Sequence, residues 1–153
     1  MNGSTLKALR SLLFFTQEEA SILIGGVSLR SWQYWEVDKR TIPQDVIDRV
    51  TSLILWRKKA IETVELALGD MLAHIPADQP VEPLTIIVYG SVEDWMTLPD
   101  REPVMWKPHC SAVANLCASF AARSIVFDAP AYARWLGKRK DNETMRGQWA
   151  ASV

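Results

Sequence analysis

Two pairs of polar side chains near the start of the chain have the chemistry of nucleic-acid recognition. Arg30 and Gln33 lie three positions apart, so a helix would present both on one face. A guanidinium can form bidentate hydrogen bonds with guanine, and a carboxamide can form them with adenine. Lys39 and Arg40 follow shortly afterwards, and their charges suit the phosphates of a nucleic-acid backbone. This spacing predicts base contacts from one helix and phosphate contacts from the loop after it.

The remaining candidate contacts surround these four residues. Leu29 could meet a thymine methyl group, and the hydroxyls of Ser28 and Ser31 lie at the edge of the same face. Tyr34 completes the outward face of the helix. Gln17 begins the preceding helix, where a helix N-terminus and a carboxamide can bind phosphate. The full set of predicted DNA-binding residues is Gln17, Ser28, Leu29, Arg30, Ser31, Gln33, Tyr34, Lys39 and Arg40.

The segment that would position these side chains is a pair of short helices joined by a tight turn. A helix expected over residues 6–15 precedes the pair. Thr16 and Glu19 form a capping-box pattern, which predicts that the first helix of the pair starts there. Gly25 and Gly26 end it, because glycine adopts the positive φ that a helix terminus often needs. The expected inward positions of this helix are Ala20, Leu23 and Ile24.

The second helix of the pair is expected over residues 29–36. Ser28 can cap it, and Trp32 and Trp35 lie three apart on the face that would turn inward. Pro43 suits the first turn of the helix that follows the basic loop. This order of parts is typical of a helix-turn-helix that reads DNA. The same pattern also fits a packed helix pair whose polar face is only solvated, so both alternatives stay open.

Helical spacing of apolar residues then continues from residue 44 to 73, and the basic cluster at residues 57–59 interrupts it. We expect two helices or one bent helix in this stretch. The basic cluster is either a solvated face or a contact for phosphate or RNA. Three prolines within residues 75–83 predict a linker after it.

The remainder of the chain has a different pattern, with short β-branched runs between helical ones. Strands are expected over residues 84–89, 104–106 and 124–127, and helices from Ser91, over 108–122 and from Asp128, before a frayed or helical tail. We therefore predict an α+β fold in two parts, an all-α domain over residues 1–73 and a small α/β domain over residues 84–153.

The charge distribution supports a nucleic-acid ligand for the first part only. The whole chain of 153 residues has a formal net charge of −1. Residues 1–60 hold nine Lys and Arg against six Asp and Glu, a balance of +3, whereas residues 61–153 hold eight against twelve, a balance of −4. The basic excess therefore lies with the predicted helix pair. Seven tryptophans indicate aromatic-rich cores or an interface.

Several other classes of protein are disfavoured. No run approaches the roughly 18 apolar residues of a membrane span, and no secretory signal is evident, so we expect a cytoplasmic protein without membrane contact. Cys110 and Cys117 are too far apart on a helix to bridge each other, which favours two small core residues. His74 and His109 lack the spacing of a zinc site, and no glycine-rich phosphate loop is present. We expect no catalytic residue, metal or cofactor, and hence no enzyme.

The order of residues around the helix pair resembles the phage-repressor-like (Xre/Cro-type) family. The matching residues are Gln17-Glu18-Glu19, Gly26-Val27-Ser28, Trp35-Glu36, Lys39-Arg40 and Pro43. The resemblance implies a lambda-repressor-like helix-turn-helix domain, with an ion pair between Arg10 and Glu36 that holds the first helix against the third. The turn is one residue longer than is usual in that family, which leaves open whether Ala20 or Ser21 is the small packing residue.

A narrower resemblance, to the YdiL-like family, covers most of the chain. It rests on the segments LKALR, TQEEA, SWQYWE, RKK, MWKPHCSAVANL and SIVFD. This family includes the anti-CRISPR-associated regulators. The resemblance implies an N-terminal helix-turn-helix domain, a C-terminal α/β domain that pairs two subunits, and a dimeric repressor that acts on inverted repeats.

We accordingly predict a sequence-specific regulator of transcription. It would bind inverted repeats in double-stranded DNA as a homodimeric repressor, and one form of this prediction is an autorepressor. One reading helix contacts few bases, so useful specificity normally needs a second copy. The alternative is an interaction or adaptor protein whose helix-turn-helix no longer binds DNA. A regulator that also binds RNA is a further alternative.

Overall fold

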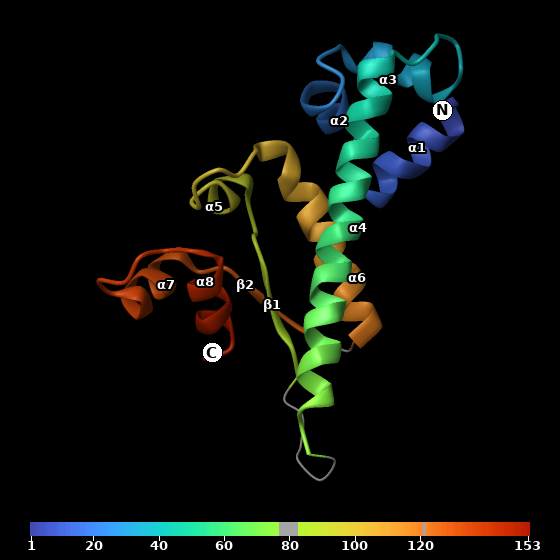
Figure 1. Cartoon of the computed structure of the whole chain (residues 1–153). Helices are drawn as coiled ribbons and strands as arrows, with labels where there is room; N and C mark the ends of the chain where they lie inside the picture. The colour runs from blue at the N-terminus through green and yellow to red at the C-terminus, as the bar shows by residue number, and fades with distance from the viewer. Residues whose placement is uncertain (77–82, 121) are drawn as a thin grey trace.

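The structure is a computed structural model that describes residues 1–76, 83–120 and 122–153, and it has a mixed α+β fold (Figure 1). The predicted fold class is confirmed. Within the described residues the elements are α1 (Gly3–Leu12), α2 (Gln17–Leu23), α3 (Leu29–Glu36), α4 (Gln44–Ala73), β1 (Thr85–Val88), α5 (Val92–Trp95), the 3-10 helix η1 (Pro103–Met105), α6 (Trp106–Phe120), β2 (Arg123–Val126), α7 (Ala129–Leu136) and α8 (Glu143–Ala150).

The helices α1, α2 and α3 gather at one end of the long helix α4 and enclose a core with it (Figure 1). The centre of this core is the indole of Trp32, which is completely buried together with Leu6 of α1 and Val50 of α4. Trp35 packs edge-on against Trp32, with the ring centroids 5.7 Å apart. The predicted inward face of α3 is therefore confirmed.

The local signals that start and end α2 and α3 act as predicted. Thr16 and Glu19 form the reciprocal capping box, in which each side chain accepts a hydrogen bond from the backbone of the other residue. Gly26 has a φ of 59° in the turn between the helices, a conformation that favours glycine. The side chain of Ser28 then caps α3. These short-range hydrogen bonds fix the length of the turn.

The inward face of α2 differs from the expected one. Ala20 and Ser21 are both buried, so both residues take the role of small packing residue. The hydroxyl of Ser21 donates to the carbonyl of Glu18 at 2.8 Å, so its burial leaves no unsatisfied polar group. Leu23 is 40% exposed, and its predicted inward position is wrong. A helix of seven residues turns only one narrow face toward the core, and Leu23 lies outside that face.

The helix α4 runs without interruption from Gln44 to Ala73, so the alternative of two separate helices is wrong. The basic cluster at residues 57–59 lies inside this helix. Arg57 turns toward α6 and donates from Nε to the Ser111 hydroxyl at 2.7 Å, and that hydroxyl donates to the carbonyl of Leu12. The two lysines of the cluster are exposed, as the interpretation of a solvated face requires.

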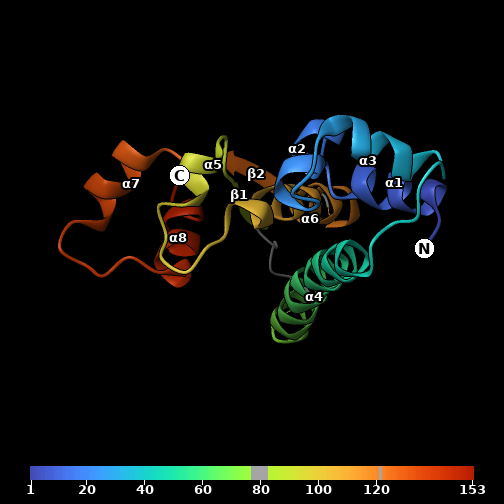
Figure 2. The same ribbon diagram turned by 90° about the horizontal axis from the view of Figure 1, so that it is seen from above.

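The second part of the chain is built on two parallel strands. β1 and β2 pair in a register that sets Thr85 opposite Arg123 and Val88 opposite Val126. The helix α6 connects them and packs along α4 (Figure 1). The helix α8 packs on β1, and both α7 and α8 lie beyond the sheet as seen from α1–α3 (Figure 2). Both predicted strands that flank α6 are confirmed.

Three further expectations for this part concern residues 104–106, the C-terminal tail and the linker. The strand predicted over residues 104–106 is wrong, because Pro103 starts the 3-10 helix η1, which leads directly into α6. The predicted tail is the folded helix α8, and its residues Arg146 and Trp149 are buried. Most of the predicted linker over residues 75–83 lies outside the described residues.

The described residues contain neither a disulfide between the two cysteines nor a helix suited to crossing a membrane. Cys110 and Cys117 are free, as predicted, and both are half-buried on α6 rather than fully in the core. In the described part of the chain, no helix combines the length and apolar character that crossing a bilayer requires.

Gly3 offers a stability test of the contact between α1 and α3. A Cβ atom at this position would lie 2.3 Å from the carbonyl oxygen of Trp35, which cannot rotate away because it belongs to the backbone. We expect Gly3→Ala to lower the free energy of unfolding by about 1–3 kcal/mol, the usual cost of overpacking, in urea denaturation. Gly69→Ala is the control, since a Cβ atom there meets nothing within 4 Å. The control should gain about 0.5–1 kcal/mol, and a Gly3→Ala variant as stable as the original would contradict the contact.

Candidate nucleic-acid interface

The candidate interface is built on a buried carboxylate at the end of α3. Glu36 is only 6% exposed and accepts hydrogen bonds from all three N-terminal helices. Its Oε1 lies 2.5 Å from Arg10 Nε of α1 and 2.7 Å from Trp32 Nε1 of α3, and its Oε2 lies 2.6 Å from Gln17 Nε2 of α2. The predicted ion pair between Arg10 and Glu36 is confirmed. One side chain thus ties the three helices together.

The surroundings of Glu36 keep its carboxyl ionised. Burial alone would raise the pKa of this carboxyl, but the hydrogen bonds from Arg10, Gln17 and Trp32, with the charge of Arg10, hold its pKa below the ordinary value of 4.5. All three donors therefore face a full negative charge, which strengthens each hydrogen bond. Arg10 Nη1 also donates to the carbonyl of Phe15 at 2.7 Å, so the same guanidinium holds the loop between α1 and α2.

Gln17 connects this buried network with the outer surface. Its Nε2 donates to Glu36, while its Oε1 accepts a hydrogen bond of 3.4 Å from Nε2 of the exposed Gln33. The carboxamide of Gln33 is therefore oriented by a contact that reaches back to the core. At the edge of the same face, the hydroxyl oxygens of Ser28 and Ser31 lie 3.1 Å apart.

Four of the predicted residues form a compact group, the Tyr34 cluster, on the outward side of α3 and the loop after it. Arg30 Nε donates to the phenol oxygen of Tyr34 at 2.7 Å. The cationic groups of Arg30, Lys39 and Arg40 lie 5.5, 5.8 and 5.1 Å from the centre of the Tyr34 ring. The three cations are exposed and Tyr34 is half-buried. Among the described residues, none of these cations takes part in an ion pair.

The nine predicted residues lie on α3, its cap, the following loop and the first turn of α2. The structure brings most of them into the Tyr34 cluster, the Gln17–Gln33 pair or the Ser28–Ser31 pair, whereas Leu29 is 38% exposed at the start of α3. Sequence reasoning missed Lys107 of α6, whose Nζ lies 3.1 Å from Glu19 Oε1 of α2. Residues so far apart in the sequence leave no local signal. The helical spacing of Arg30 and Tyr34, in contrast, was a usable sign of their contact.

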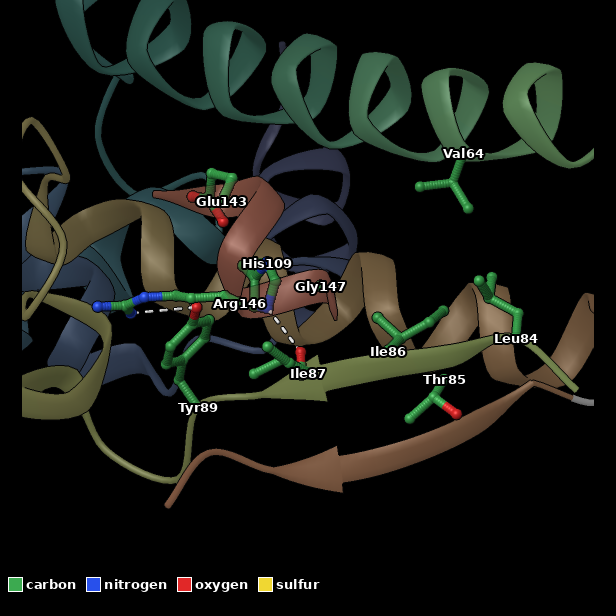
Figure 3. A pocket seen from close by; sticks show the side chains of 10 residues that line it. All are labelled: Val64, Leu84, Thr85, Ile86, Ile87, Tyr89, His109, Glu143, Arg146 and Gly147. Atoms are coloured by element: carbon green, nitrogen blue, oxygen red, sulfur yellow. Dashed lines mark hydrogen bonds between the residues drawn. The ribbon is translucent and has the colours of Figure 1, made fainter. Parts of the chain in front are cut away.

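A second candidate site is a hollow of about 320 Å³ between α4, β1 and α8 (Figure 3). Arg146 donates to the Tyr89 hydroxyl at 3.3 Å, and His109 Nε2 lies 3.1 Å from the carbonyl of Ile87. Burial lowers the pKa of His109, which favours the neutral ring. Arg146 and His109 thus form hydrogen bonds within the protein on the wall of this hollow. In the described segments, no group of three His, Cys, Asp or Glu could hold a metal ion.

The amino-acid sequence matches a known family of proteins. The chain belongs to the Aca2/YdiL-like family, whose profile matches residues 1–125. It is also similar to the Aca2 repressor of Pectobacterium phage ZF40, with 29% identity over 115 residues that span 74% of this chain and 90% of that protein. The family predicted from the sequence is confirmed. The helices α7 and α8 lie beyond the matched residues.

The lowered pKa of Glu36 predicts a pH-dependent contribution to stability. A carboxyl whose pKa is lower in the folded chain than in the unfolded chain stabilises the fold at pH values above its unfolded-state pKa. This stabilisation is lost as the pH falls through the folded-state pKa. We expect Glu36→Gln to cost about 3 kcal/mol of unfolding free energy near neutral pH, because Arg10 is left without its anion. Relative to wild type, this cost should shrink as the pH falls below 4.5.

Urea denaturation at several pH values from about neutral to about pH 3 measures this difference. Glu18→Gln, at an exposed position of the neighbouring helix α2, is the matched control and should give a small difference at every pH. A Glu36→Gln cost that stays constant over the whole range would contradict the assigned role of the carboxylate.

Proposed function

We propose that this protein is a homodimeric repressor that binds inverted repeats in double-stranded DNA in a sequence-specific way. The observation that carries the proposal is the Tyr34 cluster of Arg30, Tyr34, Lys39 and Arg40. It sets a guanine-binding side chain beside phosphate-binding ones on the second of two packed helices, which is the arrangement of a helix-turn-helix reader. The similar protein of phage ZF40 carries the name of a repressor.

In this proposal the first turns of α3 enter the major groove. Arg30 contacts guanine and Gln33 contacts adenine, each by bidentate hydrogen bonds, while the exposed Leu29 meets a thymine methyl group. Lys39 and Arg40 contact phosphate from the loop, where their charges release counterions from the DNA. The remaining contacts are Gln17, to phosphate, and Ser28 and Ser31, at the edge of the face, while Tyr34 lies on the outward face beside Arg30.

The framework behind α3 suits such a reader. Glu36 fixes α3 against α1 and α2, so the base-reading side chains start from a defined position and lose less freedom on binding. The balance of +3 over residues 1–60 adds a general attraction for the DNA backbone, whereas the balance of −4 over residues 61–153 keeps the rest of the chain away from it.

The strand β2 has an open edge that a second copy can pair with. The backbone N–H groups of Arg123 and Phe127 bond to β1, so those of Ser124 and Val126 point to the opposite edge. In the described residues no further strand covers this edge, and Val126 is 63% exposed. Open edges are templates for pairing with another chain. Two-fold pairing of β2 with the β2 of a second copy would join both sheets across the dimer axis.

The alternative, an interaction or adaptor protein that has lost DNA binding, draws on Leu29. An apolar side chain that is 38% exposed on the outward face of α3 also fits contact with another protein. A regulator that also binds RNA would use the same cations. Dependence on salt and on base sequence separates the DNA reader from the interaction protein, because only a DNA reader should show both with duplex DNA.

Two substitutions in the Tyr34 cluster should have different effects on DNA binding. Arg30→Ala should relax the preference at one base pair of each half-site and cost about 1–3 kcal/mol of binding free energy. Lys39→Ala should weaken binding to all sequences alike and reduce the salt slope by about one. Selection from a random duplex library, followed by salt titrations of the enriched sequence, measures both.

If the folded, dimeric wild-type protein enriches no sequence at any salt concentration, the proposed DNA-binding function is wrong and the interaction protein is favoured. If Arg30→Ala changes neither the affinity for DNA nor the base preference, the proposed DNA binding stands but the assigned position of α3 in the groove is wrong.

Ser124 tests the proposed dimer. Its N–H points away from β1, so Ser124→Pro should remove a hydrogen bond between copies while the pairing of β1 with β2 stays intact. Ser124→Ala keeps the N–H and is the matched control. We expect the dimer of the proline variant to dissociate at a protein concentration at least about tenfold higher than that of the alanine variant. The loss of one hydrogen bond per copy is enough for a change of about tenfold in the dissociation constant. Analytical ultracentrifugation measures this, and equal dimerisation of both variants would exclude the β2 edge.

A further inference from the structure

Tyr34 lies at the centre of the group of cations on α3, and we infer that it is a positioning residue. It orients Arg30 for a base contact and holds Lys39 and Arg40 for phosphate, and it does not itself read DNA. This inference rests on the proposed DNA-binding function and assigns a role within it. Tyr34 makes three contacts that support this role: one to Arg30, one to the loop backbone and one to the loop cations.

The contact with Arg30 leaves the useful end of the guanidinium free. Arg30 Nε donates to the Tyr34 hydroxyl at 2.7 Å, and the two residues are one helical turn apart. The terminal nitrogens of Arg30 are not used in this hydrogen bond, and these are the atoms that form a bidentate contact with guanine. An exposed arginine otherwise samples many rotamers, so a partner that orders it before binding lowers the entropy lost in the complex.

The loop that carries the phosphate-binding cations also returns to Tyr34. The backbone N–H of Lys39 donates to the carbonyl of Tyr34 at 2.9 Å. Asp38, which precedes it, has a φ of 56°, and its Oδ1 accepts a hydrogen bond of 2.6 Å from the N–H of Gly3. The loop is therefore held on one side by α3 and on the other by the start of α1. Its path brings Lys39 and Arg40 over the Tyr34 ring.

The electrostatics of the Tyr34 cluster favour a bound anion. Three cationic groups lie within 6 Å of one ring centre, and the described residues provide none of them with an ion-pair partner. The negative face of the ring offsets part of their mutual repulsion. A phosphate group would offset the rest, because it adds negative charge where three positive charges converge. The ring thus lets the cations approach one another before DNA arrives.

Tyr34→Phe separates positioning from direct reading. This variant removes the hydroxyl bonded to Arg30 and keeps the ring. If Tyr34 positions Arg30, discrimination at the guanine that Arg30 contacts should fall by at least about fivefold, which is the lower end of the discrimination that a bidentate contact provides. The salt slope should stay unchanged. If the hydroxyl instead binds phosphate directly, all sequences should lose affinity equally and the base preference should stay the same.

A double-mutant cycle makes the test of Arg30 independent of total affinity. In the Arg30→Ala background, Tyr34→Phe should have no further effect at that base pair, because the residue it orients is gone. Tyr34→Leu removes the ring as well, so Lys39 and Arg40 lose their common partner. The salt slope of this variant should fall by about one for each phosphate contact that is lost.

Val37→Ala is the matched control, because Val37 is 61% exposed at the end of α3 and outside the Tyr34 cluster. It should leave base preference and salt slope unchanged. Thermal unfolding of every variant checks that α3 is intact. A wild-type protein that selects no duplex would overturn both the proposed function and this inference. A wild-type protein that selects an operator, with Tyr34→Phe keeping full guanine discrimination, would overturn this inference alone.

Discussion

The arrangement of the N-terminal helices depends on one buried negative charge. An ionised carboxylate in a protein core is costly unless donors replace its water, and Glu36 has donors from α1, α2 and α3. The helices α2 and α3 have seven and eight residues, too few for stability on their own. They are held together because the separation of α1 or α2 from α3 would remove one of the donors to this charge. The orientation of the exposed carboxamide of Gln33 follows from the same network through Gln17.

The helix α6 extends this rigid arrangement to the rest of the chain. The Ser111 hydroxyl accepts from Arg57 of α4 and donates to the end of α1, and Lys107 pairs with Glu19 of α2. Val104, just before α6, belongs to the same core as Trp32. The N-terminal helices are thus packed directly on the helix that connects β1 to β2. In the proposed dimer, the orientation of the two α3 helices would follow from contacts through α6.

Short-range signals made much of the fold predictable, and long-range contacts account for the errors. Thr16, Ser28 and Asp128 cap helices with hydrogen bonds that reach only three residues ahead, so the sequence shows them directly. Sequence spacing did not decide between one helix and two over residues 44–73, because the Ser111 partner of Arg57 lies 54 residues away. Spacing likewise did not decide between a frayed and a helical tail, because the hydroxyls of Tyr89 and Thr97 that accept from Arg146 are distant in the sequence. The candidate site follows from helical spacing, but the approach of the loop cations to α3 depends on the path of a loop that spacing cannot show. The DNA contacts themselves remain predictions.

The helices beyond the family match are bound into the fold by a second buried charge. Arg146 of α8 is 1% exposed, pairs with Asp141 and donates to the hydroxyls of Tyr89 and Thr97, which both lie within the matched residues. Removal of α8 would leave those hydroxyls without this donor and would uncover the apolar side of β1. In the described residues each strand of the sheet has one strand partner, and α8 packs on β1. The contacts of α8 with β1 are therefore compatible with the proposed two-fold pairing through β2.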